Sequence, residues 1–149
     1  MPGNQSFASA SRLTLQSQLE DLVLVWPWVE SQATAHAIPA DTVFAIQLCL
    51  EEALSNVIRH GYGNKPGETL TVDCAVDGNN ELALTVEDRA PAFDPLAAPE
   101  TENDARLSSI DELKPGGRGI RLMRKFAGGV AYQRLPRGNR LTLRFTIPR

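Results

Sequence analysis

Apolar residues recur at helical spacing in the first half of the chain. They stand three or four positions apart over residues 18–36, where Pro27 should kink or restart the helix. The same spacing predicts a long helix over residues 41–60, with Asp41 as its N-cap. Before both helices, the alternation over residues 12–16 is typical of a short strand.

Apolar residues alternate with polar ones in the second half. Residues 70–76 and 82–86 both follow this period of two, and the turn at residues 77–80 joins them into an antiparallel hairpin. The pattern predicts a further helix and two more strands at residues 120–126, 130–135 and 141–147. We therefore expect an α/β (α+β) fold, a two-layer sandwich whose mixed, mostly antiparallel sheet carries helices on one face.

Two segments show neither the helical spacing nor the period of two. Residues 1–10 are small and polar, and we interpret them as a flexible leader before one domain at residues 11–149. Residues 89–116 contain four prolines and are longer than a connector needs to be. This segment is either a functional lid, which we place near residues 94–116, or locally disordered, and a short helical turn is expected near residues 106–113.

Composition supports a single globular domain. The chain has 149 residues, of which 42% are hydrophobic, and no apolar run approaches the ~20 residues that span a bilayer. Residues 1–10 also lack the basic start and apolar core of a secretory signal, so we expect a cytoplasmic protein without a membrane partner. Cys49 and Cys74 lie in apolar stretches without metal-ligand spacing, and we expect both to be buried thiols.

Charge is distributed unevenly along the chain. Residues 13–58 contain no Lys or Arg, whereas residues 114–149 contain ten basic residues and no acidic one. The basic third is expected to face nucleotide phosphates, an acidic protein surface or simply solvent. The net charge of −3 argues against a dedicated nucleic-acid binder.

The polar side of the long helix carries the first candidate chemistry. Glu52 and Asn56 are four residues apart, and we expect them side by side, opposite the apolar stripe that includes Ala53 and Val57. An amide oxygen there binds Mg²⁺, while a carboxylate one turn away accepts a proton from an attacking hydroxyl or water. A solvated helix face shows the same pattern, and Glu51 is the weaker candidate.

A carboxylate and a glycine run complete the candidate chemistry. Asp88 continues the apolar face that ends at Val86, so it should point to the covered side of the sheet, where it needs a donor such as the exocyclic amine of adenine. A solvated strand end is the alternative. The glycines within residues 116–119 precede a helix and offer backbone N–H groups to phosphate, although such turns are also common helix starts.

In this order, residues 52–62, 88–95 and 117–120 resemble the sequence boxes of the histidine-kinase-like ATPase (GHKL) superfamily. The resemblance is strongest to the small bacterial anti-sigma-factor serine kinases, and it extends from about Leu13 to Ile147. It implies that Glu52 is the catalytic base, that Asn56 holds Mg²⁺ and that Asp88 reads adenine. It also implies a set of further nucleotide-binding residues: His60, Ala90, Phe93, Gly117, Arg118, Gly119, Ile120 and Asn139.

Individual positions refine the resemblance. Asn139 stands where relatives often place a threonine near the adenine, and His60 is expected in the pocket wall or packed at the helix end. Ala90 replaces a usual glycine and should restrict the backbone and crowd the base, and Arg121 replaces another glycine and should alter lid closure or reach a phosphate. Sensor histidine kinases share the boxes, but neither His36 nor His60 has the setting of a phosphoacceptor histidine.

The resemblance implies a cytoplasmic, bacterial protein serine/threonine kinase that uses ATP and Mg²⁺. Its substrate would be a small anti-sigma-factor antagonist, and it would sequester a sigma factor when that antagonist is absent or phosphorylated. No direct nucleic-acid partner is expected, and a homodimer is left open. The alternatives are a non-catalytic, nucleotide-gated binding module and an interaction domain that binds no nucleotide.

Overall fold

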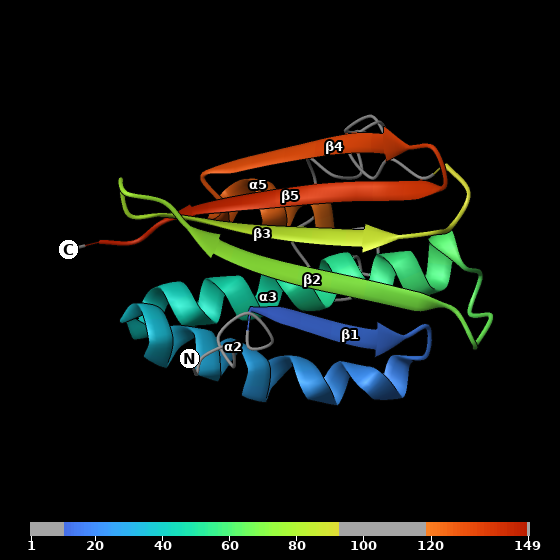
Figure 1. Ribbon diagram of the computed structural model, residues 1–149, viewed down its shortest axis with the longest axis horizontal. Coiled ribbons are helices and arrows are strands. Elements are labelled where there is room, and N and C mark those ends of the chain that lie inside the picture. The colour runs from blue at the N-terminus through green and yellow to red at the C-terminus, as the bar shows by residue number, and fades with distance from the viewer. Residues whose placement is uncertain (1–10, 93–118, 149) are drawn as a thin grey trace, which may run out of the picture.

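A five-stranded sheet forms one layer of the fold (Figure 1). The computed structural model describes residues 11–92 and 119–148, so the expected leader and most of the expected lid lie outside the described residues. In spatial order the strands are β1 (Arg12–Gln16), β2 (Thr69–Val76), β3 (Glu81–Asp88), β5 (Gly138–Thr146) and β4 (Gly129–Leu135). All four pairings between these strands are antiparallel, so the described sheet contains no parallel pair where a mixed sheet was expected.

Helices form the second layer, and Figure 1 shows α3 and α5 behind the sheet. The helical elements are the 3₁₀ helix η1 (Leu19–Leu24), α2 (Val25–His36), α3 (Ala40–Asn56), the π-helical turn η2 (Val57–Gly61) and α5 (Gly119–Phe126). Both α2 and α5 pack against α3. The predicted two-layer sandwich is therefore confirmed.

Both long helices differ from their predicted limits. The segment expected as one helix over residues 18–36 divides into η1 and α2, and Pro27 lies in the first turn of α2, where a missing N–H costs no hydrogen bond. Asp41 is not the N-cap of α3, because the helix begins at Ala40 and Pro39 occupies the cap position. The α-helical form ends at Asn56, and the chain continues to Gly61 as the π turn.

The core lies between α3 and the covered face of the sheet. Alternate residues of β3 are buried, from Leu82 through Val86 to Asp88, and they face the buried stripe of α3 that includes Leu50 and Ala53. Asp88 therefore continues an apolar face, as the alternation predicts. The strands position its carboxylate at the end of the core nearest the C-terminus of α3.

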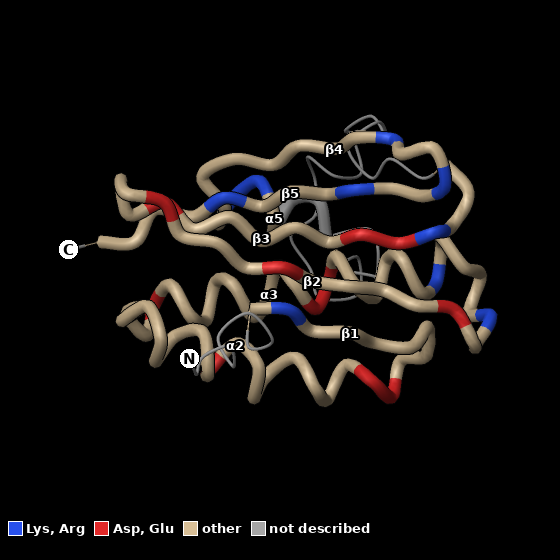
Figure 2. Tube along the Cα trace, in the orientation of Figure 1, with Lys and Arg blue, Asp and Glu red and all other residues tan. Residues whose placement is uncertain are grey.

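The uneven charge of the sequence is also visible in the fold, where basic residues gather on β4, β5 and α5 (Figure 2). Arg140 Nε on β5 forms an ion pair of 2.6 Å with Glu87 Oε2 on β3. Both residues belong to the solvent face, because their neighbours Asp88 and Asn139 are buried on the other one. At least this part of the basic run serves a solvated face, where such pairs contribute little stability.

Both cysteines are buried, as predicted. Cys49 lies in α3 and Cys74 in β2, and burial raises the pKa of each thiol to about 12. Thiols with such pKa values carry almost no reactive thiolate at neutral pH. Among the described helices, none is long and apolar enough to cross a membrane.

Candidate functional site

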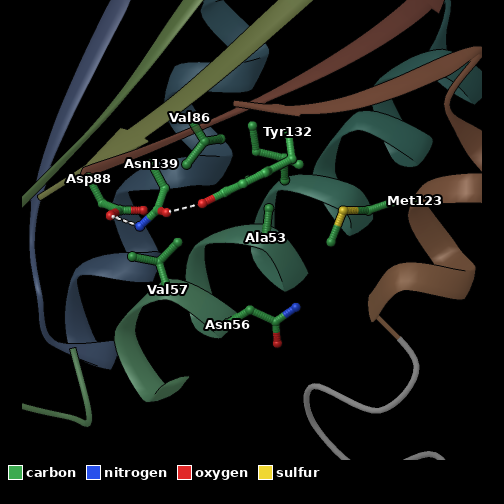
Figure 3. Close-up of a pocket in the computed structure, with 9 residues that line it drawn as sticks. Ala53, Asn56, Val57, Val86, Asp88, Met123, Tyr132 and Asn139 are labelled. Atoms are coloured by element: carbon green, nitrogen blue, oxygen red, sulfur yellow. Dashed lines mark hydrogen bonds between the residues drawn. The ribbon is translucent and has the colours of Figure 1, made fainter. Parts of the chain in front are cut away.

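A cavity between α3 and the sheet gathers the main candidate residues (Figure 3). Its walls are mostly apolar, and its polar side chains come from four different elements, α3, β3, β4 and β5. The lining residues are Ala53, Asn56, Val57, Val86, Asp88, Met123, Tyr132, Asn139 and Leu141. In Figure 3 the amide of Asn56 points away from the Asp88–Asn139 pair, so the cavity has two separate polar ends.

Asp88 forms the first polar end. Its side chain is only 6% exposed, and its Oδ1 accepts hydrogen bonds of 2.8 Å from Asn139 Nδ2 and 2.8 Å from the backbone N–H of Ala90. Burial raises the pKa of Asp88, while these two donors and the charge of Arg134 oppose the rise. The structure thus keeps a carboxylate in an apolar cavity with its proton affinity increased.

Asn139 completes this end of the cavity. It lies directly opposite Asp88 in the β3–β5 register. Its Nδ2 also donates to the carbonyl oxygens of Pro91 at 3.0 Å and Ala90 at 3.3 Å, and its Oδ1 accepts from the Tyr132 hydroxyl. The three acceptors surround the amide nitrogen of Asn139, and the tyrosine donor faces its amide oxygen. These partners fix which way the amide group is turned.

Gly138 allows the two strands to meet at this point. Its φ is +149°, and a Cβ placed on it would lie 2.8 Å from the carbonyl carbon of Asp88, still closer to that carbonyl's oxygen, and 2.9 Å from Arg89 Cα. All three are backbone atoms of a paired strand and its end, so they cannot give way cheaply. A glycine is therefore required immediately before Asn139.

Arg134 fastens the chain that follows Asp88. Its Nη1 donates to the carbonyl oxygens of Ala90 at 3.0 Å and Gly138 at 2.8 Å. The guanidinium thus holds the end of β3 to the β4–β5 hairpin. Sequence analysis did not single out this residue, because its contact with Ala90 joins positions that are 44 residues apart.

Asn56 forms the second polar end, in a different setting from the one predicted. It is only 3% exposed and lies beside Ala53 and Val57 in the cavity wall, so its expected place opposite these residues is wrong. The physical reason is that three residues are about 60° short of a full helical turn, which puts Asn56 next to Ala53. Within the described residues, Asn56 Oδ1 has no hydrogen-bond partner.

A buried amide oxygen without a partner is suited to Mg²⁺, which prefers hard oxygen ligands. The described residues contain no cluster of three or more His, Cys, Asp or Glu side chains that could hold a metal. Mg²⁺ commonly binds through one protein oxygen together with the phosphates of a nucleotide. The residues present therefore fit a metal that arrives with a nucleotide, and do not form an all-protein metal site.

Glu52 lies one turn before Asn56 on α3. It is half-buried, and it does not line this cavity. Glu51 is exposed and accepts a 2.8 Å hydrogen bond from Gln47 Nε2, so it points elsewhere, as expected. Only Glu52 of the two lies on the same side of the helix as Asn56.

His60 and Ala90 differ from their expected environments. His60 is exposed on η2 and is not among the residues that line the cavity, because the change to π-helical geometry at Val57 alters the direction of the residues that follow. Ala90 is buried but also lies outside the lining, and a Cβ on Gly61 would be 3.2 Å from Ala90 Cβ. Its methyl group therefore faces the end of η2 and does not crowd the cavity.

The glycine-rich candidates lie at the limit of the described chain. Gly119 and Ile120 begin α5, which agrees with a glycine turn that opens a helix. Phe93, Gly117 and Arg118 lie outside the described residues, as do the side chains of Gly119, Ile120 and Arg121.

Tyr132 and Met123 line the cavity, although sequence analysis did not select them. Tyr132 lies on β4 and points toward Asn139, and Met123 comes from α5 and is fully buried. The alternation of β4 indicated that Tyr132 shares a face with Val130, but it did not indicate which strand β4 joins. The contact of Tyr132 with Asn139 follows from the β4–β5 pairing.

Comparison with known proteins identifies the family. Residues 15–145 match the family described as "Histidine kinase-like ATPase domain". The serine/threonine-protein kinase BtrW of Bordetella bronchiseptica is 33% identical over 117 residues, which cover 78% of this chain and 79% of that relative. The anti-sigma F factor of Oceanobacillus iheyensis is 24% identical over 90 residues, 60% of this chain and 59% of that protein.

Solved structures show the same fold. The histidine kinase domain of the blue-light activated histidine kinase from Erythrobacter litoralis EL346 aligns with a TM-score of 0.54 at 15% identity, over 82% of this chain and 60% of that one. Another chain of that kinase aligns with a TM-score of 0.52 at 20% identity, over 74% of this chain and 32% of its own length. At these identities the likeness establishes the fold alone.

Proposed function

Since the chain belongs to the histidine kinase-like ATPase domain family, we propose that it is an ATP- and Mg²⁺-dependent protein serine kinase with an anti-sigma role. Its substrate would be a serine of a small anti-sigma-factor antagonist. It would sequester a sigma factor when that antagonist is absent or phosphorylated. The similarity to a protein named as a serine/threonine kinase and to one named as an anti-sigma factor supports this proposal.

The observation that carries the proposal is the presence of Asp88 and Asn56 at separate ends of one cavity. A nucleotide is itself bipolar, with a base that offers N–H donors and phosphates that bind Mg²⁺. The Asp88 carboxylate suits the first, and the Oδ1 of Asn56, which has no hydrogen-bond partner among residues 11–92 and 119–148, suits the second. The apolar wall between them suits the flat faces of a purine.

At the base end, Asp88 accepts a hydrogen bond from the exocyclic amine of adenine. Guanine presents a carbonyl oxygen at the corresponding position, and two acceptors facing each other in a dry cavity repel. Asn139 and the backbone N–H of Ala90 hold the carboxylate in place through Oδ1. Selection of ATP over GTP thus rests on a carboxylate that the fold keeps buried and oriented.

At the phosphate end, Asn56 would hold Mg²⁺ through Oδ1. A metal ion held there would supply neutralisation of the phosphate charge. Because Asn56 is 3% exposed and fixed on α3, it would contribute a ligand that needs little reorganisation.

Glu52 is the proposed general base. The serine oxygen attacks the γ-phosphorus, the bond from that phosphorus to the bridging oxygen of ADP breaks, and the hydroxyl proton passes to the Glu52 carboxylate. Such general-base assistance is typically worth about 10²–10⁴-fold in rate. Glu52 lies one turn from Asn56, which places a base next to the expected metal and γ-phosphate.

Phosphoryl transfer by Glu52→Gln tests the catalytic role. Labelled ATP, Mg²⁺ and the antagonist that purifies with the protein are incubated with wild type, Glu52→Gln and Glu51→Gln. We expect Glu52→Gln to bind ATP nearly as well as wild type and to transfer phosphate about 10²–10⁴-fold more slowly. Glu51→Gln is the matched control on the exposed side of α3, and it should remain close to wild type.

Two other outcomes would favour the alternatives. If wild type and Glu52→Gln both fail to phosphorylate the antagonist while ATP still changes partner affinity, the protein is a non-catalytic, nucleotide-gated switch. If neither variant binds ATP at all, the chain is an interaction domain that has lost nucleotide binding.

A further inference from the structure

We propose that Tyr132 occupies the base end of the cavity in the ligand-free protein and must turn away before adenine enters, so that this residue sets the nucleotide affinity. The inference rests on the proposed nucleotide-binding function. It concerns a residue that neither the sequence pattern nor the family resemblance selected. It is carried by the cavity volume, the strand position of Tyr132 and its hydrogen bond to Asn139.

The cavity is too small for a base in the arrangement described. It encloses about 20 Å³, which is room for about one water molecule. A purine is several times larger, and ligand pockets usually measure about 300–1,000 Å³. At least one side chain of the lining must therefore move when a nucleotide binds.

Most of the lining cannot move without disturbing the core. Val86 and Leu141 belong to β3 and β5, which are interior strands with partners on both sides, and both side chains are buried. Asp88 is held by two hydrogen bonds. Ala53 is small, so its displacement would release little space.

Tyr132 is the largest side chain of the lining, and it lies on an edge strand. Among the described strands, β4 pairs with β5 alone and contains no fully buried residue, whereas the other long flexible lining residue, Met123, is fully buried. Figure 3 shows the ring of Tyr132 extending across the cavity, with the hydroxyl directed at Asn139. Rotation of this side chain out of the cavity releases the volume of a whole aromatic ring.

The hydroxyl of Tyr132 also occupies a hydrogen-bonding position that the base needs. It donates to Asn139 Oδ1, whose own amide nitrogen is committed to Asp88 Oδ1 and to two backbone carbonyls. Oδ1 of Asn139 also lies 3.5 Å from Arg134 Nη1, and a carbonyl oxygen can accept two hydrogen bonds, so when the tyrosine leaves, Oδ1 can accept from a ligand donor beside the Asp88 carboxylate. The exocyclic amine of adenine has two N–H donors that match these two acceptors, whereas guanine has an acceptor at that position.

Before a nucleotide binds, the tyrosine hydroxyl therefore donates the hydrogen bond to Asn139 that the adenine amine donates afterwards. Binding replaces the Tyr132 hydroxyl by the adenine amine as the donor to Asn139. The ATP affinity of wild type is therefore lowered by the free energy of the Tyr132 contacts that must be broken. The hydrogen bond from Tyr132 to Asn139 is one between neutral groups. Its removal should lower the Kd for ATP about 2- to 10-fold. Removal of the ring should tighten binding further, because the cavity is then already open.

Calorimetric titration with Mg²⁺·ATP of wild type, Tyr132→Phe, Tyr132→Val and Gln133→Val tests the inference. We expect Tyr132→Phe to bind about 2- to 10-fold more tightly than wild type, and Tyr132→Val more tightly again. Gln133→Val makes a comparable change at the next residue of β4, which is exposed, and should leave the affinity unchanged. Tyr132→Phe keeps the ring and secures the test if the valine variant does not fold.

The possible failures are distinguishable. If wild type binds ATP and both Tyr132 variants bind equally or more weakly, the inference is overturned and the proposed function stands. If wild type does not bind but Tyr132→Val does, the inference is supported in its strongest form. If no variant binds any nucleotide, the proposed function fails and the inference fails with it.

Discussion

Replacement of Asp88 by asparagine should separate the cost of this residue to folding from its value to binding. The substitution keeps the shape of the side chain and removes its negative charge. Burial raises the folded-state pKa of Asp88 above its unfolded value, so its contribution to stability is fully present below the unfolded pKa, near 3.8, and is lost as pH rises through the folded pKa. Ionised Asp88 therefore destabilises the ligand-free fold at pH 7, and the Asn variant should be at least as stable as wild type there.

Binding should change in the opposite direction. In the structure, two donors engage Asp88 Oδ1. The amide oxygen of an asparagine will stay with them, which leaves its NH₂ group facing the cavity and the amine of adenine. Loss of a hydrogen bond to a charged acceptor costs about 1.5–3 kcal/mol, which corresponds to about a 10- to 150-fold increase in the Kd for ATP. The affinity for GTP should rise relative to the affinity for ATP, because the new NH₂ group can donate to the carbonyl oxygen of guanine.

Calorimetric titrations with ATP and GTP, together with urea unfolding at pH 7 and pH 4, measure both effects. Asp73→Asn is the matched control, because Asp73 is partly exposed on the solvent face, where it pairs with Arg12. Saturation at a hundredfold excess over Kd should stabilise wild type by roughly 2.7 kcal/mol, and the Asp88 variant by less at the same concentration. Unchanged ATP affinity in Asp88→Asn, or equal binding of ATP and GTP by wild type, would refute the reasoning.

Two further substitutions test the frame of the site. Gly138→Ala should lower the unfolding free energy and abolish ATP binding, because its Cβ would clash with the Asp88 backbone, whereas Gly78→Ala, which has open space around it, should do neither. Urea unfolding checks this, and near-wild-type stability of Gly138→Ala would contradict it. Asn56→Ala should eliminate the Mg²⁺ dependence of ATP binding and phosphoryl transfer, yet change ligand-free stability by only about 1 kcal/mol, because the amide oxygen loses no hydrogen bond within the described part of the chain. Titrations with and without Mg²⁺ decide this, and retained Mg²⁺-dependent phosphorylation would remove Asn56 from the site.

Features set by local periodicity could be predicted from the sequence. Alternation over β2 and β3 identified the hairpin, and it placed Asp88 on the covered face because side chains two residues apart share a face. The family resemblance selected Asn139 as a residue near the adenine, and the register shows that it lies opposite Asp88.

Features that depend on distant contacts could not be predicted. The π turn η2 is accompanied by tertiary bonds of Tyr62, whose hydroxyl donates to the Thr69 carbonyl and accepts from the Arg89 N–H. His60 lies in this turn and is exposed, whereas the sequence had placed it either in the pocket wall or packed at the helix end. Tyr132 and Arg134 were missed for a similar reason, because their roles follow from how the β4–β5 hairpin meets the end of β3.

The account's central claim is that a nucleotide binds in this cavity with its base at Asn139 and its metal at Asn56. NMR observation of the side-chain amide groups of both residues, during titration with ATP and Mg²⁺ and then with Mn²⁺ in place of Mg²⁺, tests it most directly. We predict that both signals shift on addition of ATP, that Mn²⁺ broadens Asn56 more strongly than Asn139, and that Asn79 in the exposed β2–β3 turn is unaffected. Unchanged Asn56 and Asn139 signals at saturating ATP, or broadening centred away from Asn56, would contradict the account.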